Sequence, residues 1–217
     1  MPSDANPLIQ NAYRPVPGWS LLVFAVALPI IGFGVARFLP DSEMLTILGA
    51  FFAIGFLALV VAVAPLGRAA LPALGLRPAN WKYVVFGPLA TLALSVAVSQ
   101  LGIEPQGMKK VIEFVPEQVI PSLLLLAVLA PIVEELVFRG LIYGWIAGRW
   151  GTMAGFIVSS LAFAAAHFEP AHIVLVLPLG LLFGWMRRRT DSLLPSLVCH
   201  ILNNGFALLA AVYLPGV

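Results

Sequence analysis

The sequence carries little charge for its length. Of its 217 residues only 10% are Asp, Glu, Lys or Arg, whereas 61% are hydrophobic and the mean hydropathy is +1.01. Soluble domains carry roughly 25% charged residues. A soluble fold cannot hide so much apolar surface, which disfavours cytosolic, secreted, disordered and nucleic-acid-binding proteins, and the net charge of +2 adds little. The composition is that of an integral membrane protein.

Several chemical groups used by other proteins are scarce or absent. Cys199 is the single cysteine, which excludes an internal disulfide framework and a Cys-rich metal site. The aspartates are Asp4, Asp41 and Asp191, all in expected loops or tails, so an aspartyl pair inside the membrane is excluded. The sequence also lacks the Gly-x-Ser-x-Gly motif of serine hydrolases and the His-Glu-x-x-His helix of zincins.

Long hydrophobic runs fill most of the remaining sequence. A membrane-spanning helix needs about 20 mostly apolar residues. Seven segments are candidates, of which the fifth and sixth are short: 19–39, 44–66, 83–101, 121–148, 152–167, 172–186 and 192–214. We therefore predict an all-α polytopic membrane helix bundle with about seven to eight transmembrane helices.

The chain before the first and fourth spans is more polar. Residues 1–18 are polar and rich in proline, and the run that follows is too long for a cleavable signal peptide. We expect a tail at 1–18 and one transmembrane domain at 19–217. In the segment 109–120, Lys, Glu and Gln alternate with Val, Ile and Phe, which predicts an interfacial helix or a loop. An eighth hydrophobic element within it stays an open alternative.

The basic residues are distributed unevenly between the two sides of a seven-span bundle. Eight fall on the side of the N-terminus: Arg14, Arg68, Arg77, Lys82, Arg149, Arg187, Arg188 and Arg189. Three fall on the other side: Arg37, Lys109 and Lys110. Because cytoplasmic loops carry an excess of Lys and Arg, we expect a multi-pass protein of the cell (inner) membrane with a cytoplasmic N-terminus.

Three charged residues lie inside the fourth span, where charges are rare and usually functional. They are Glu134, Glu135 and Arg139. Glu135 and Arg139 are four residues apart and share a helical face, so an ion pair between them is expected, while Glu134 points about 100° away. Glu134 is thus left free. The alternative is that all three form a polar cluster that only ties helices together.

Two other spans carry polar residues at compatible depths. His167 ends the fifth span, and His200 and Asn204 share one face of the seventh. Together with Glu134 they lie about 8–15 residues from the cytoplasmic ends, or about 12–23 Å, so one polar layer near mid-membrane is expected. Such a layer could hold a metal, or let the carboxylate activate water while other groups stabilise an oxyanion. Either scheme indicates hydrolysis.

Three motifs on successive spans carry a family resemblance. Glu134-Glu135-x-x-x-Arg139, Phe163-x-x-x-His167 and His200-x-x-x-Asn204 resemble, in order and spacing, the motif set of the CPBP (Abi) family of type II CAAX prenyl endopeptidases and bacteriocin-processing membrane proteases. The resemblance covers about half of the chain, with a catalytic core at about 122–209. It implies an all-helical intramembrane endopeptidase whose cavity opens toward the cytoplasm.

The resemblance also implies roles for individual residues. Glu134 would be the general base acting on water with His167, and His200 with Asn204 would stabilise the oxyanion or help to bind a metal. Glu135, Arg139 and Phe163 would shape the site.

Alternatives remain open for the cofactor, the substrate and the class of function. Zinc or another divalent metal, if one is used, would be bound by Glu134, His167 and His200, and metal-free chemistry is equally compatible with these residues. The expected partners are the lipid bilayer and a peptide or protein substrate, which is lipid-modified in eukaryotic members; nucleic acid is not expected. A non-proteolytic immunity or scaffold protein of the same fold is the main alternative, and a transporter or proton relay is the weaker one.

Overall fold

The computed structural model describes residues 16–39 and 43–214, and this part of the chain contains helices and no strand. The predicted all-α class is therefore confirmed. The α-helices are α2 (Gly18–Ala36), α3 (Met44–Val63), α4 (Ala70–Ala73), α5 (Trp81–Ser99), α6 (Gln106–Phe114), α7 (Val119–Ser122), α8 (Ala130–Glu135), α9 (Tyr143–Ala165), α10 (Pro170–Thr190) and α11 (Leu194–Tyr213). Two π-helical segments, Leu123–Leu129 and Leu136–Ile142, join α7 to α8 and α8 to α9.

Six helical stretches of the described residues are long and apolar enough to cross a membrane. One of them, Val119–Ala165, has 47 residues and contains two of the predicted spans. It is interrupted at Gly151, whose φ of 84° and ψ of 163° are not helical. Gly155 then lies against Ala147 and the carbonyl oxygen of Tyr143, so the chain doubles back on itself after Gly151. All seven predicted segments are helical, and no eighth span is found among the described residues.

The helix α10 is longer than the sequence indicated, because it includes the basic run that was expected to end it. The Arg187 side chain is fully buried instead of exposed in a loop. Its Nε donates a 3.0 Å hydrogen bond to the carbonyl oxygen of Arg139, and its Nη1 contacts Asp191 at 2.9 Å. These partners stabilise a charge inside the bundle, which the local sequence does not reveal.

The segment before the fourth span was predicted to be a helix or a loop. It forms a short amphipathic helix, α6. Its N-terminus is tied to the loop between α9 and α10. Glu169 accepts hydrogen bonds from the backbone N–H groups of Gly107 (3.1 Å) and Gln106 (2.6 Å), and these donors hold its pKa below the usual range. The carboxylate caps α6, because the first N–H groups of a helix lack partners within it.

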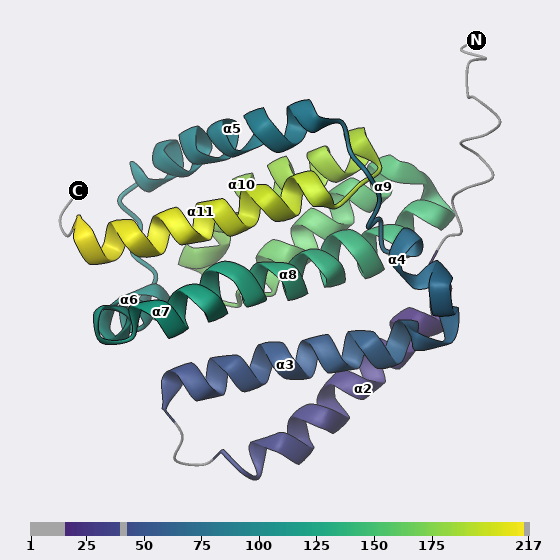
Figure 1. Cartoon of the computed structure of the whole chain (residues 1–217), viewed down its shortest axis with the longest axis horizontal. Coiled ribbons are helices and arrows are strands. Elements are labelled where there is room, and N and C mark those ends of the chain that lie inside the picture. Colours follow the sequence, from purple (N-terminus) through teal and green to yellow (C-terminus); the bar gives the residue numbers. More distant parts are fainter. Residues whose placement is uncertain (1–15, 40–42, 215–217) are drawn as a thin grey trace.

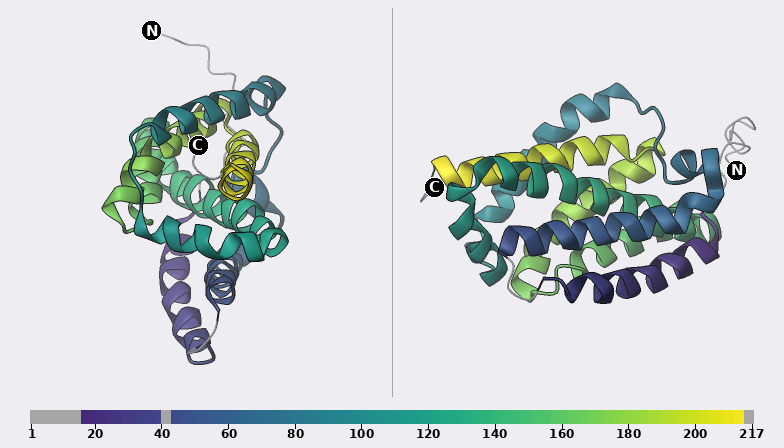
Figure 2. Two further views of the ribbon diagram at one scale, coloured as in Figure 1. Left: turned by 90° about the vertical axis from the view of Figure 1, so that its left-hand side faces the viewer. Right: turned by 60° about the horizontal axis from the view of Figure 1, so that its bottom comes forward.

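The long helices run roughly parallel to one axis of the molecule (Figure 1). Helices α2 and α3 form an antiparallel pair that projects from the other helices in the left view of Figure 2. Their contacts with the fourth span are apolar, with Phe52 packed among Leu125, Val133 and Val137. The beginning of α2, α4 and the end of α10 lie at one end of the bundle, and α6 and the end of α11 lie at the other.

The reversal at Gly151 depends on a small residue at position 155. A Cβ atom there would lie 3.0 Å from the Cβ of Ala147 and 3.2 Å from the carbonyl oxygen of Tyr143. We expect Gly155→Ala to destabilise the protein by about 1–3 kcal/mol, measured by thermal unfolding in detergent, because the helices cannot separate without loss of packing. The matched control Gly32→Ala, whose Cβ would meet nothing within 4 Å, should be neutral or slightly stabilising. Equal effects of both variants would contradict this account of the reversal.

Candidate active site

A buried ion pair lies at the centre of the site. Arg139 Nη1 is 3.0 Å from Glu135 Oε1, and both side chains are fully buried. Arg139 Nη2 donates to the carbonyl oxygen of Gly180 in α10 at 3.0 Å, and its guanidinium lies 4.2 Å from the ring centroid of Phe163. The predicted pairing of Glu135 with Arg139 is present, and it also joins two further stretches of helix.

His200 lies between the two adjacent glutamates. Its Nδ1 is 3.3 Å from Glu135 Oε1 and its Nε2 is 3.5 Å from Glu134 Oε2. The imidazole stacks on Phe183, with a centroid distance of 4.9 Å and an interplanar angle of 28°. Because a carboxylate only accepts hydrogen bonds, the ion-paired Glu135 favours a proton on Nδ1 and leaves Nε2 directed to Glu134.

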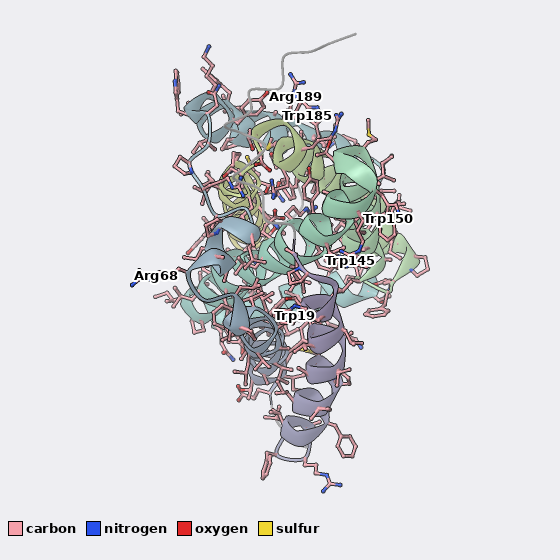
Figure 3. All side chains as sticks on the ribbon, turned by 90° about the vertical axis from the view of Figure 1, so that its right-hand side faces the viewer. Trp19, Arg68, Trp145, Trp150, Trp185 and Arg189 are labelled. Atoms are coloured by element: carbon pink, nitrogen blue, oxygen red, sulfur yellow. The ribbon has the colours of Figure 1, made fainter. Side chains whose placement is uncertain are left out.

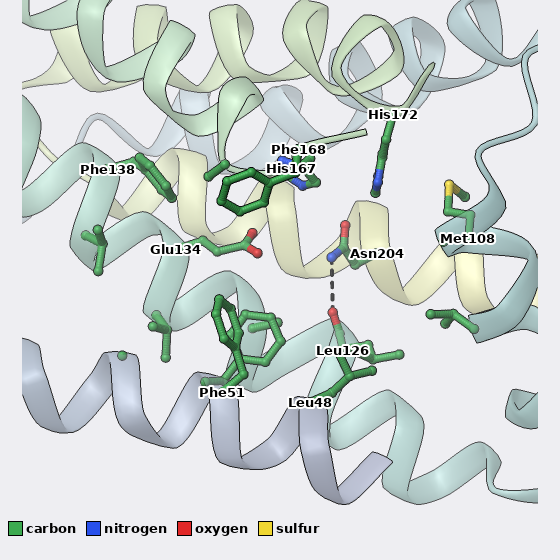
Figure 4. Close-up of a pocket in the computed structure, with 18 of the residues that line it drawn as sticks. Leu48, Phe51, Met108, Leu126, Glu134, Phe138, His167, Phe168, His172 and Asn204 are labelled. Atoms are coloured by element: carbon green, nitrogen blue, oxygen red, sulfur yellow. Dashed lines mark hydrogen bonds between the residues drawn. The ribbon is translucent and has the colours of Figure 1, made fainter. Parts of the chain in front are cut away.

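Glu134 differs from Glu135 in its access to open space. Its side chain is 20% exposed, whereas that of Glu135 is fully buried. It lines a cavity of about 650 Å³ and also a neighbouring cavity of about 340 Å³. The larger one is enclosed mainly by apolar side chains from α2, α3, α6 and the fourth span, and Figure 4 shows the Glu134 carboxylate directed into it.

His167 lines the same two cavities from the end of the fifth span. Its Nδ1 is 3.0 Å from the carbonyl oxygen of Phe163, one helical turn earlier. Since a carbonyl oxygen cannot donate, Nδ1 carries the proton and Nε2 keeps its lone pair. The ring packs edge-to-face on Phe163 and on His172, with centroid distances of 5.1 and 4.5 Å.

Asn204 is positioned by the π-helical segment on the opposite side of the cavity. Its Nδ2 donates a 3.0 Å hydrogen bond to the carbonyl oxygen of Leu126, which fixes the orientation of the carboxamide. Figure 4 shows this bond and places Oδ1 on the side of His167 and His172. The structure thus brings the four predicted catalytic residues to one region from three spans.

Sequence reasoning missed four contributors to this arrangement. They are Ser196, which donates to Glu135 Oε2 at 2.6 Å; the carbonyl oxygen of Gly180; the ring of Phe183; and His172, which lines both cavities. Ser196 precedes His200 by four residues, so its shared helical face was a usable signal. The Gly180 carbonyl gives no side-chain signal at all.

The metal set proposed from the sequence does not come together as a preformed site. Among the described residues, no three His, Cys, Asp or Glu side chains form a group that could hold a metal ion. Nδ1 of His200 is directed to Glu135, and its Nε2 lies 3.5 Å from Glu134 Oε2. Metal binding by Glu134, His167 and His200 therefore stays a prediction, and the metal content of the protein tests it.

The two glutamates should respond differently to loss of charge. Glu135→Gln leaves the fully buried Arg139 without its counter-charge, which costs about 3–5 kcal/mol, or roughly 10 °C in melting temperature. Glu134→Gln removes only a long contact at a cavity wall and should melt close to wild type. Thermal unfolding in detergent measures both. Comparable losses in the two variants would show that Glu134 is as structural as Glu135.

The donor arrangement also gives an expectation for metal content. We expect elemental analysis of the detergent-purified protein to find no stoichiometric zinc or other transition metal, because the three donors do not converge. Glu134→Ala and His167→Ala serve as controls, with folding checked by circular dichroism. Near-stoichiometric metal in wild type that is lost in both variants would overturn this expectation.

Comparison with known proteins agrees with the motifs. Residues 116–206 match the family model described as type II CAAX prenyl endopeptidase Rce1-like. The chain is 27% identical over 104 residues to the candidate membrane peptidase YdiL of Bacillus subtilis (strain 168). The aligned residues make up 48% of this chain and 41% of YdiL. It is 33% identical over 89 residues to the membrane-embedded CAAX protease MroQ of Staphylococcus aureus (strain USA300), which covers 38% of this chain and 36% of MroQ. No matching solved structure was found.

The matched segment contains every residue of the three motifs and overlaps most of the catalytic core expected at about 122–209. The matches span about two fifths of the length of these two relatives. The resemblance to the type II CAAX prenyl endopeptidases is confirmed, since residues 116–206, about two fifths of the chain, match the Rce1-like family model.

Proposed function

We propose that this chain is a membrane-embedded endopeptidase in which Glu134 activates the water molecule that attacks the peptide bond. The observation that carries the proposal is the contrast between two adjacent carboxylates. Glu135 is fully buried and paired with Arg139, while Glu134 faces two cavities and contacts His200. A carboxylate held beside open space and beside an oriented imidazole has the geometry of a general base.

The first step is the attack of water on the scissile carbonyl carbon. A water molecule in the cavity donates one hydrogen to the Glu134 carboxylate and the other to Nε2 of His167, which leaves its oxygen lone pairs for the substrate. The new C–O bond forms as the water proton moves to Glu134, and the carbonyl π electrons move to the oxygen. This assignment is supported by the lone pair that the Phe163 contact leaves on His167.

The second step is the collapse of the tetrahedral intermediate. The C–N bond breaks, and the leaving nitrogen takes the proton from Glu134. Before that transfer, His200 Nε2 can share the proton, since it lies 3.5 Å from Glu134 Oε2. The successive contacts from Arg139 to Glu135 and from Glu135 to His200 hold the imidazole beside Glu134, which supports the role of Glu134 as a base. Asn204 Oδ1 is an acceptor and suits a substrate N–H better than an oxyanion.

The cavity limits the substrate to a chain with large apolar groups near the scissile bond. Phe24, Leu28, Leu48 and Phe52 line it from α2 and α3. Such a surface suits aliphatic or aromatic side chains, or a lipid chain attached to the substrate, because burial of apolar area is favourable. No step needs a metal in this scheme.

Replacement of Glu134 tests the proposal directly. We expect Glu134→Gln to lower the cleavage rate of a fluorogenic peptide with apolar flanking residues by about 10²–10⁴-fold in proteoliposomes, because the amide cannot take a proton from water. Glu43→Gln is the matched control, since Glu43 is exposed and lines neither cavity. Circular dichroism and melting temperature show whether each variant is folded.

The same experiment separates catalysis from a scaffold role. A folded Glu134→Gln protein that cleaves the peptide at the wild-type rate would refute the proposed base. A scaffold or immunity protein would keep its function in this variant as long as the fold is kept.

A further inference from the structure

The two ends of the helix bundle differ in charge. The end formed by the beginnings of α2 and α5, the Gly151 turn and the end of α10 is rich in basic residues and tryptophan, and Figure 3 shows six of these side chains gathered there. Its described members are Trp19, Arg68, Arg77, Trp81, Lys82, Trp145, Arg149, Trp150, Trp185, Arg187, Arg188 and Arg189. We call this the basic end. An excess of Lys and Arg marks the cytoplasmic side of a membrane protein.

The opposite end carries mainly acidic residues. It is formed by α6, the end of α11 and the loop between α9 and α10, and we call it the acidic end. Its described charges are Arg37, Glu43, Glu104, Lys109, Lys110, Glu113, Glu117 and Glu169. This end carries three Lys or Arg residues against seven at the basic end, so the positive-inside rule assigns it to the non-cytoplasmic side.

The basic end is closed by packed side chains. A cluster of buried apolar residues fills the space between the polar layer and this end: Val16, Leu59, Val63, Ala70, Ala73, Leu74, Leu136, Leu141 and Leu193. Beside it, the buried Arg187 is bonded to the backbone of Arg139 and to Asp191, which also pairs with Arg77 at 2.7 Å. A peptide cannot reach Glu134 through this layer without unpacking it.

The cavity instead extends toward the acidic end. Its exposed lining residues lie on the first half of α3, on α6, at the turn after His167 and on α11: Phe51, Gly107, Met108, Ile112, Ala166, Phe168 and Ala207. Phe168 is 84% exposed and has a positive φ of 58°, which is unusual for a bulky residue. Helix α6, held by Glu169, lies at the rim of this opening.

We infer that substrate reaches Glu134 from the non-cytoplasmic side of the membrane, past α6 and the turn at Phe168. The inference rests on the proposed function and narrows its substrate to a peptide segment that is exported or anchored at the outer surface. It departs from the cytoplasmic opening that the family resemblance implied. The reason is the combination of a packed basic end with a cavity whose lining extends to α6 and the turn at Phe168.

Cysteine labelling tests the direction of access without relying on proteolysis. In a Cys199→Ala background, Phe168→Cys places a thiol at the cavity mouth and Trp150→Cys places one at the basic end. With a membrane-impermeant maleimide, we expect Phe168→Cys to react in right-side-out vesicles and Trp150→Cys to react only in inside-out vesicles. The reverse pattern, or reaction of either variant from both sides, would overturn the inference.

A matched pair of buried alanines tests access to the cavity itself. Ala130 lines the cavity one helical turn before Glu134, and Ala73 belongs to the packed cluster at the basic end; each is 4% exposed. We expect a small impermeant methanethiosulfonate to modify Ala130→Cys from the outside only, and Ala73→Cys from neither side. Modification of Ala130→Cys from the cytoplasmic side, or from neither side, would overturn the inference.

The labelling result is independent of the proposed chemistry. If the thiols react as expected but wild type cleaves no peptide, the direction of access holds and the endopeptidase proposal fails. If wild type cleaves the peptide but Ala130→Cys reacts only from the cytoplasmic side, the chemistry holds and the inference about access fails.

Discussion

The buried ion pair between Glu135 and Arg139 is the contact on which the arrangement of the site depends. Both charges lie out of contact with solvent, where an unpaired charge would be costly, so the pair is stabilised by further hydrogen-bond partners. Those partners come from elsewhere in the chain: the Gly180 carbonyl from α10, and Ser196 and His200 from α11. Satisfying one pair of charges therefore fixes how three stretches of helix meet.

The position of Glu134 follows from this pair. His200 is held on one side by Glu135 and on another by the ring of Phe183, and it presents its second nitrogen to Glu134. The two glutamates are neighbours in sequence, yet a helix directs them to different surroundings. One becomes part of the packed structure and the other is left facing a cavity.

Much of this could be predicted from the sequence because it follows from spacing within a helix. Four residues separate Glu135 from Arg139 and His200 from Asn204, and such pairs share a face whatever surrounds them. The long hydrophobic runs predicted the all-α class for a similar reason, because the length of an apolar run is a local property of the sequence. The catalytic roles of Glu134, His167, His200 and Asn204 stay predictions.

Features that depend on distant parts of the chain could not be predicted in this way. The burial of Arg187 requires the backbone of Arg139 and the side chain of Asp191, so its sequence neighbours suggested a loop. The cavity is enclosed by helices from both halves of the chain, and the first half carries no motif. Glu134, His167 and His200 lie at similar depths when residues are counted from the ends of their spans. Such a count does not determine the direction in which the ring nitrogens point.

The apolar packing of α2 and α3 against the fourth span bears on how related proteins could come to differ in the substrates that they accept. These helices supply one wall of the cavity, yet they lie outside the segment that carries the Rce1-like match and contact the fourth span through apolar side chains. Apolar contacts tolerate exchange of one hydrophobic residue for another of similar size far better than a charged network does. Under the proposed endopeptidase function, substitutions in the first two helices would change peptide preference while Glu134, His167 and His200 stay unchanged, which would let one catalytic unit serve many different substrates.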